Sequence, residues 1–246
     1  MSALHVGETI KITGANRHPV ADALLIDNLD LSDASIVDIG ASDGTTSVDL
    51  IRKLPAFKSY VIADLFLTIT AIRLSRHVLF YDQSTCILIS RPRCVAWPTA
   101  SRLIRLLCSP LIGLAVRDSD QRTEIQLLNP SARQLVAADP RVTVAVHDVF
   151  EPWPKPAPDV IKVGNLLRRI YFDDPTICHA LRALLASLDD GGHLLIVDNP
   201  RIKGIDSRAG LYKRAGDRFV VVARTEDIPE IDDLILQVEL DEELVA

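Results

Sequence analysis

The feature that most constrains the fold is a short apolar run that passes through small residues into a helical pattern. Residues 35–39 read Ser-Ile-Val-Asp-Ile, residues 40–44 read Gly-Ala-Ser-Asp-Gly, and residues 45–50 read Thr-Thr-Ser-Val-Asp-Leu. β-Branched residues favour a strand, small residues favour a tight turn, and the apolar spacing that follows is helical. The stretch therefore predicts a strand, a turn and a helix start.

The turn at residues 40–44 has the chemistry of a nucleotide site. Small side chains let a ligand approach the backbone, and the free N–H groups of a helix N-terminus favour electron-rich groups. Asp38 stands two residues before Gly40, and the third glycine of the dinucleotide fingerprint is missing. An acid aimed into the turn repels a pyrophosphate but suits a ligand with an ammonium group. The turn therefore fits S-adenosylmethionine better than NAD.

This stretch resembles motif I of the class I S-adenosylmethionine-dependent methyltransferases, whose usual form is Asp/Glu-x-Gly-x-Gly-x-Gly. Ser42 replaces the middle glycine. The resemblance implies an α/β fold, a three-layer Rossmann-like sheet that is mostly parallel and ends in an antiparallel hairpin. It also implies that the cofactor contacts Asp38, Gly40, Ala41, Ser42 and Gly44.

The second strand is expected at residues 60–64 and ends in Asp64, 24 residues after Gly40. An acid at this place accepts a ribose diol in nucleotide-binding α/β folds, and the methyltransferases place one here. Asp64 and the adjoining Leu65 are therefore expected at the cofactor. A competing register stays open, in which residues 124–128 form the second strand and Asn129 takes the place of Asp64.

Two further strands are expected to end at the cofactor. Residues 142–147 lead to Asp148 and Val149, which the resemblance makes adenine contacts. Residues 160–163 lead to the Gly164-Asn165 turn, and the segment from Asp159 through Tyr171-Phe172 to the glycines at 191–192 is similar to the chemotaxis-receptor glutamate methyltransferases. Near the end of the sequence, strands are expected at residues 211–214, 218–223 and 234–240, the last two as the antiparallel pair.

An insert interrupts this order. The methyltransferase domain is expected over residues 1–64 and 123–246, and residues 65–122 form an α+β lid over the active site. The insert contains a hairpin at residues 77–82 and 85–90, and a helix at residues 99–117 that Pro110 breaks. Between residues 65 and 117 there are seven arginines, no lysine and one acid, Asp82. This segment can be a solvated surface, a lid over an anionic or acyl-bearing acceptor, or a peripheral membrane contact through residues 99–117.

Charge and cysteine content narrow the classes of partner. The net charge of −6 and the pI near 5.5 argue against general nucleic-acid binding. The four cysteines show no zinc-ligand spacing and no disulfide framework, so no metal is expected. The first residues lack the pattern of an export signal, and a cytoplasmic location is expected, with membrane association and a homodimer left open.

The leading functional hypothesis is a methyltransferase that acts on an unidentified, small amphiphilic or anionic acceptor. Proximity to the sulfonium methyl group supplies most of such catalysis, and His77, His147, Tyr171 and Asn165 are the candidates for a base. The alternatives are an inactive S-adenosylmethionine-binding regulatory or scaffold module and, less favoured, a nicotinamide-dependent oxidoreductase. Asp38 and the antiparallel end of the sheet disfavour the oxidoreductase.

Overall fold

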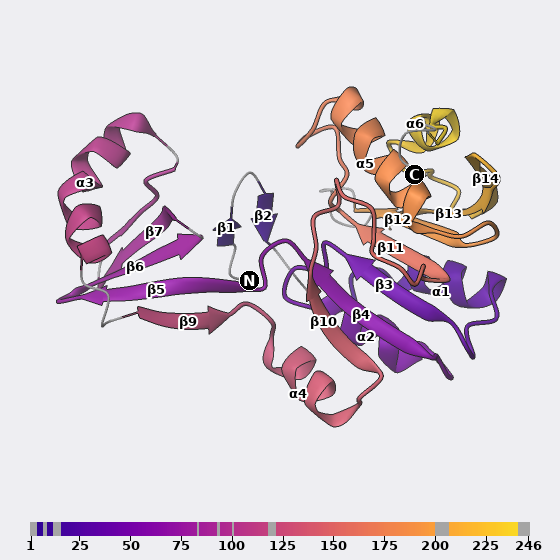
Figure 1. Cartoon of the computed structure of the whole chain (residues 1–246), viewed down its shortest axis with the longest axis horizontal. Helices are drawn as coiled ribbons and strands as arrows, with labels where there is room; N and C mark the ends of the chain where they lie inside the picture. Colours follow the sequence, from indigo (N-terminus) through magenta and orange to yellow (C-terminus); the bar gives the residue numbers. More distant parts are fainter. Residues whose placement is uncertain are drawn as a thin grey trace. The chain divides into compact units, whose positions relative to one another are not determined.

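The chain divides into two compact units in the computed structural model (Figure 1). The larger unit contains residues 13–65 and 128–246, and the smaller unit contains residues 1–12 and 66–127. The division places residues 1–12 and 123–127 in the smaller unit and Leu65 in the larger one, whereas the sequence suggested the opposite assignment for each. The structure describes residues 4–6, 9–11, 16–82, 84–92, 94–99, 101–117, 122–199 and 207–240.

The larger unit is built on a seven-stranded sheet in the order β10-β4-β3-β11-β12-β13-β14. The first five of these strands are parallel to their neighbours, and β13 and β14 are antiparallel additions at one edge. This confirms the expected fold class. The bounds are β3 (Ser35–Ile39), β4 (Ser59–Asp64), β10 (Val142–Val146), β11 (Val160–Gly164), β12 (His193–Asp198), β13 (Arg208–Ala215) and β14 (Arg218–Arg224).

Helices cover both faces of this sheet. Lys53 of α2 binds Asp22 of α1 at 2.7 Å, and α2 contacts α4, so these three helices form one layer. The β11-α5-β12 connection runs in the opposite direction along the sheet, which places α5, with α6 beside it, in the other layer. The bounds are α1 (Pro19–Asn28), α2 (Thr45–Lys53), α4 (Pro130–Ala138), α5 (Asp174–Ser187) and α6 (Asp232–Gln237).

The two faces of the parallel strands carry different side chains. Ile161 and Val163 of β11 belong to an apolar core that the buried side of α5 completes, including Leu181 and Leu184. Lys162 lies between them in the strand, so its side chain points to the opposite face. Asp38 is its direct neighbour on β3 in the sheet register.

Asp38 and Lys162 form a buried ion pair with an Oδ2–Nζ distance of 2.9 Å. Both side chains are almost fully buried, at 2% and 0% exposure. The same carboxylate oxygen accepts hydrogen bonds from the hydroxyls of Ser47 at 2.8 Å and Tyr60 at 3.0 Å. The network therefore joins β3, β11, β4 and α2. Burial beside the Asp38 carboxylate raises the pKa of Tyr60 well above its usual value, so this phenol stays protonated.

Two expectations about the sheet are wrong. Residues 234–240 do not form a strand, because α6 occupies Asp232–Gln237 and buries Leu234 and Ile235 against the core; β13 and β14 form the antiparallel pair instead. The competing register for the second strand is also excluded. β4 ends at Asp64 within the large sheet, whereas residues 122–126 pair with the smaller sheet.

The smaller unit is a five-stranded antiparallel sheet in the order β8-β7-β6-β5-β9, together with α3 and the β1-β2 pair. The expected hairpin at residues 77–90 is confirmed as β6 and β7. The bounds are β1 (Leu4–Val6), β2 (Thr9–Lys11), β5 (Thr68–Leu74), β6 (His77–Asp82), β7 (Thr85–Arg91), β8 (Cys94–Ala96), α3 (Arg102–Arg117) and β9 (Arg122–Gln126).

Pro110 does not break α3, contrary to expectation. A proline at this position cannot donate to the carbonyl of Leu106, four residues earlier. The hydroxyl of Ser109 donates to this carbonyl at 2.8 Å and replaces the missing bond. The helix continues to Arg117, yet within the described parts of the chain no helix has the length and apolarity that a membrane span needs.

We expect Lys162→Met to lower the free energy of unfolding by about 3–5 kcal/mol, because it leaves a buried carboxylate without its cation. Lys155→Met is the matched control, since Lys155 pairs with Asp189 at 2.7 Å with both side chains exposed. That variant should lose less than about 1 kcal/mol. Denaturant titration measures both values, and equal losses would contradict the assigned role of the buried pair.

Candidate functional site

The candidate site lies where the strand order of the large sheet reverses. From β3 the chain proceeds outward to β4, whereas from β11 it proceeds the other way to β12 (Figure 1). Ligands of open α/β sheets bind at the carboxyl ends of the strands at such a switch point. Gly40 follows β3 at this edge and Gly164 ends β11, so the fold brings together two turns that the sequence analysis singled out.

The turn after β3 depends on left-handed backbone conformations. Gly40, Ser42 and Gly44 have φ angles of 73°, 59° and 78°. A Cβ on Gly40 would also approach a side-chain carbon of Leu166 to 2.7 Å. The Ser42 conformation is uncommon for a residue with a side chain, and its buried hydroxyl has no hydrogen-bond partner among the described residues. Gly44 then caps the N-terminus of α2.

Asp64 connects the end of β4 to this turn. Its carboxylate accepts the backbone N–H of Ser42 at 2.7 Å, and the residue is 7% exposed. Ala41 lies between the same two elements, because its N–H donates to the carbonyl of Ala63 at 3.0 Å. Leu65, which follows Asp64 in the chain, is 42% exposed. The acid expected at a ribose therefore lies directly beside the glycine turn.

Asn129 also reaches the turn, although it ends no strand of the large sheet. It caps α4 by accepting the N–H of Ala132, and its amide donates to the Asp43 carbonyl at 2.9 Å and to the Thr45 hydroxyl at 3.0 Å. The chain thus returns from the smaller unit directly to the turn. Asn129 fixes the shape of the loop and does not replace Asp64.

Asp38 is placed differently from what its charge suggested. Strand alternation turns its carboxylate to the face covered by α1 and α2, where Lys162, Ser47 and Tyr60 already bind it. All three groups bind the same oxygen, Oδ2, and hold this side of the carboxylate against β11, β4 and α2. Asp38 instead holds the end of β3 in place beneath the turn.

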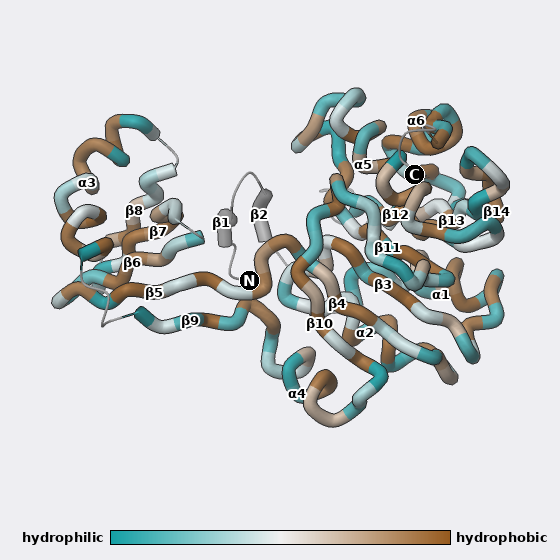
Figure 2. Tube along the Cα trace, viewed as in Figure 1, coloured by the Kyte–Doolittle hydropathy of each residue, from teal (hydrophilic) through white to brown (hydrophobic). Residues whose placement is uncertain are grey.

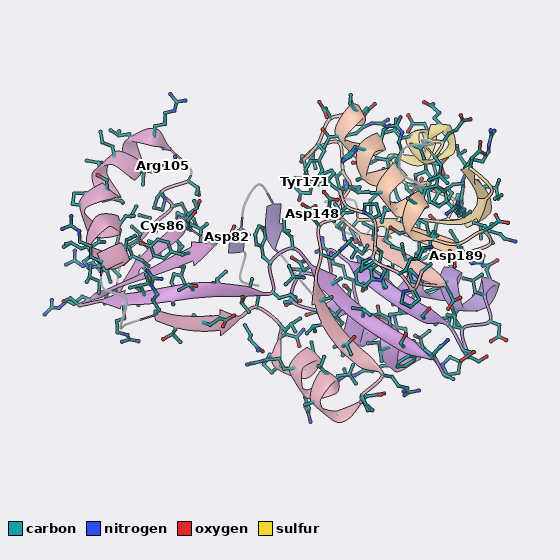
Figure 3. The ribbon with its side chains drawn as sticks, in the orientation of Figure 1. Asp82, Cys86, Arg105, Asp148, Tyr171 and Asp189 are labelled. Carbon is teal, nitrogen blue, oxygen red and sulfur yellow. The ribbon has the colours of Figure 1, made fainter. Side chains whose placement is uncertain are left out.

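The segment after β10 carries Asp148, which is labelled in Figure 3. Its carboxylate accepts the N–H of Phe150 at 3.1 Å, and Val149 is buried. His147 packs edge-on against Trp153, with ring centroids 4.7 Å apart, and burial lowers its pKa. His147 is therefore mainly neutral at pH 7, which a base requires, but its ring is held by packing.

The turn after β11 is organised by paired amides. The side-chain oxygen of Asn165 accepts the backbone N–H of Asn199, and its side-chain nitrogen donates to the Asn199 oxygen, both at 2.7 Å. Asn165 has a left-handed φ of 58°. Because Asn199 follows β12, this pair of hydrogen bonds connects the carboxyl ends of two neighbouring strands.

His18 lies against this turn and was not singled out from the sequence. Its ring fills the space beside Gly164, where a Cβ would approach the Cε1 atom to 2.9 Å. The Asn165 nitrogen lies 3.0 Å from Nε2. Since the Asn165 oxygen is already occupied by the N–H of Asn199, Nε2 must accept and the proton of the neutral ring belongs on Nδ1.

The His18 ring is neutral throughout the physiological range. Burial, with the nearby Lys162 and Arg17 cations, lowers its pKa to about 3. Its Nδ1 is buried and has no hydrogen-bond partner in the described parts of the chain. An unpartnered donor at the carboxyl edge of β11 can bind a hydrogen-bond acceptor of a ligand, such as a carboxylate or carbonyl oxygen.

The remaining candidate bases, His77 and Tyr171, belong to different units. His77 begins β6 in the smaller unit. Tyr171, labelled in Figure 3, follows Asn165 in the larger unit, and its N–H donates to the Arg168 carbonyl. No group of His, Cys, Asp and Glu side chains that could hold a metal occurs in the described residues.

A usable sequence signal for part of this site was Lys162 itself. A lysine inside the apolar run of residues 160–163 requires a buried counter-charge, and Asp38 stands in the equally apolar run of residues 35–39. His18 offered no such signal. Only the contact between α1 and the end of β11 gives it a role.

No protein-family model matches the sequence, and no curated protein matches it significantly. Similar solved structures include the mitomycin 7-O-methyltransferase MmcR, with 18% identity, 75% of this chain and 37% of that chain covered, and a TM-score of 0.37. The YcgJ protein from Bacillus subtilis is 14% identical, with 74% of this chain and 51% of that chain covered and a TM-score of 0.38. The methyltransferase CalH in complex with SAH is 16% identical, with 75% of this chain and 37% of that chain covered and a TM-score of 0.38. The matches cover between 37% and 51% of those chains, and the sheet topology carries the argument here.

Acid should destabilise the protein through His18. The pKa of about 3 in the folded state lies below the ordinary 6.5, so only the unfolded chain binds this proton between those values. Above pH 6.5 the neutral His18 does not lower the free energy of unfolding. As the pH falls below 6.5, protonation of His18 in the unfolded chain lowers the free energy of unfolding by up to about 1.4 kcal/mol per pH unit. His18→Gln should lose less stability than the wild type between neutral and mildly acidic pH in urea titrations.

His77→Gln is the matched control for this measurement, since it removes a histidine from the smaller unit. Its stability should depend more steeply on pH than that of the His18→Gln variant. Identical pH dependence in the wild type and the His18→Gln variant would contradict a buried neutral His18.

Proposed function

We propose that the protein is an S-adenosylmethionine-dependent methyltransferase that acts on a small-molecule acceptor. The observation that carries the proposal is the pairing of Asp64 with the Ser42 N–H, at the carboxyl edge of β3 and β4. It places a carboxylate beside a turn of small residues at the N-terminus of α2, next to the switch point of the sheet. A ribose diol and a neighbouring thioether or sulfonium chain suit these groups.

The proposed roles follow the order of the strands. The backbone of Gly40, Ala41, Ser42 and Gly44 approaches the centre of the cofactor, and Asp64 with Leu65 binds the ribose. Asp148 and Val149 bind the adenine, and Gly164 with Asn165 lies toward the methionine end. Asp38 acts indirectly, because its carboxylate fixes β3 through Lys162.

Methyl transfer makes modest chemical demands on these residues. The acceptor nucleophile attacks the sulfonium methyl group, the carbon–sulfur bond breaks, and S-adenosylhomocysteine leaves. Aligning the two reactants supplies most of the rate enhancement. A proton on the acceptor passes to solvent or to a base, and His147 and Tyr171 remain weak candidates for that base. The solved methyltransferase-like structures include one in complex with apigenin, which is consistent with a small-molecule acceptor.

A second candidate function is a cofactor-binding regulatory module without transfer activity. The specific observation in its favour is Ser42, a residue in left-handed conformation with a buried, unpartnered hydroxyl inside the turn. The nicotinamide-dependent oxidoreductase is disfavoured by the antiparallel β13-β14 edge. Measuring NAD binding by calorimetry separates it from both other functions.

Asp64→Asn should weaken the binding of S-adenosylhomocysteine by about ten- to a hundred-fold, as expected for loss of hydrogen bonds to a charged group. Asparagine can still accept the N–H of Ser42, so the turn is retained. Isothermal titration calorimetry measures the change. Unchanged affinity in this variant would remove Asp64 from the proposed site.

Asp190→Asn is the matched control, because the Asp190 carboxylate also accepts a backbone N–H, that of Gly216 at 2.8 Å, away from the proposed site. It should bind the cofactor product as the wild type does. If the wild type binds the product but transfers no labelled methyl group to any extract fraction, the regulatory module replaces the enzyme as the conclusion.

A further inference from the structure

Helix α3 has two apolar faces, and within the described residues only one of them packs against a hydrophobic core. On the inner face, Cys108, Leu111, Ile112 and Ala115 pack against the core of the smaller sheet, which includes Leu79. This face accounts for the attachment of α3 to its own unit. Figure 2 shows further hydrophobic stretches along the same helix.

The second apolar face, here called the leucine face, consists of Leu103, Leu106, Leu107 and Leu114. These side chains are 65%, 69%, 72% and 55% exposed. Their spacing of three, four and seven residues places them on one stripe of the helix. Exposed leucines gathered in this way mark a surface that another body covers, unlike single apolar residues scattered over a surface.

The charges on α3 indicate which kind of partner covers the leucine face. Arg102, Arg105 and Arg117 are exposed along α3, and no acidic residue occurs within the helix. Arg105 is labelled in Figure 3. The rest of the chain is acidic overall, since the net charge is −6. A helix with an exposed apolar stripe and only positive charges suits a surface that is apolar inside and anionic outside.

We propose that α3 docks the protein on an anionic lipid bilayer, with the helix lying in the plane of the interface. The leucine face enters the boundary between headgroups and acyl chains, and the arginines bind lipid phosphates and carboxylates. A helix of 16 residues is about 24 Å long and carries arginines near both ends, which fits this orientation.

A second copy of the chain is the less suitable occupant. In a symmetric dimer formed through the leucine face, the positively charged α3 helices of the two copies would face each other without a compensating acid on the helix. A bilayer with anionic headgroups supplies that compensation. The docking proposal is independent of the proposed methyl transfer.

The test is co-sedimentation of the full chain with vesicles. Vesicles of phosphatidylcholine mixed with phosphatidylserine should pellet the protein, vesicles of phosphatidylcholine alone should pellet much less, and added salt should release it. The variant Leu106→Gln/Leu107→Gln should bind the mixed vesicles at least about ten-fold more weakly. Both positions are exposed, so its circular dichroism and melting should match the wild type.

The matched control is Ile228→Gln/Leu236→Gln, which removes two apolar side chains that are 47% and 41% exposed in the larger unit. It should bind vesicles as the wild type does. Failure of the wild type to pellet with the mixed vesicles overturns the proposal, and so does equal binding by both variants. Concentration-dependent dimers that only Leu106→Gln/Leu107→Gln abolishes, without vesicle binding, would assign the leucine face to a second copy instead.

Discussion

The interaction on which the larger unit depends is the buried ion pair between Asp38 and Lys162. It joins β3 to β11, the two parallel central strands between which the order of the strands in the sheet reverses. An isolated charge in such a core is costly, so each partner requires the other and the register of the two strands is fixed. The hydroxyls of Ser47 and Tyr60 extend the same constraint to α2 and β4.

The buried ion pair also positions the turns at the carboxyl edge of the sheet. With β3 and β11 held in register, the turns that follow them lie at one switch point, and each turn is then fixed from a neighbouring strand. Asp64 of β4 holds the first turn through Ser42, and Asn199 after β12 holds the second through Asn165. The candidate site is therefore an edge of stiff turns, which suits a reaction that relies on alignment of reactants.

The smaller unit is largely an insertion in the chain between β4 and α4. It begins after Asp64 and Leu65, and Asn129 bonds to the turn of the larger unit as soon as the chain returns. The insertion therefore leaves the path of the large sheet intact. Its helix α3 continues through Pro110 because Ser109 satisfies the freed carbonyl, and that continuity aligns the leucine face on one stripe.

The sequence by itself determined the parallel strands, the glycine turn, the acid at the end of β4 and the hairpin of the smaller unit. These follow from local chemistry: β-branched runs, small residues at left-handed positions, and period-two alternation. The tertiary structure alone decided that Asp232–Gln237 forms a helix that buries Leu234 and Ile235, that Asp38 faces Lys162, and that His18 lies against Gly164. Each of these depends on residues far apart in the chain, such as Asp38 and Lys162, whose contact is created only when the strands pair.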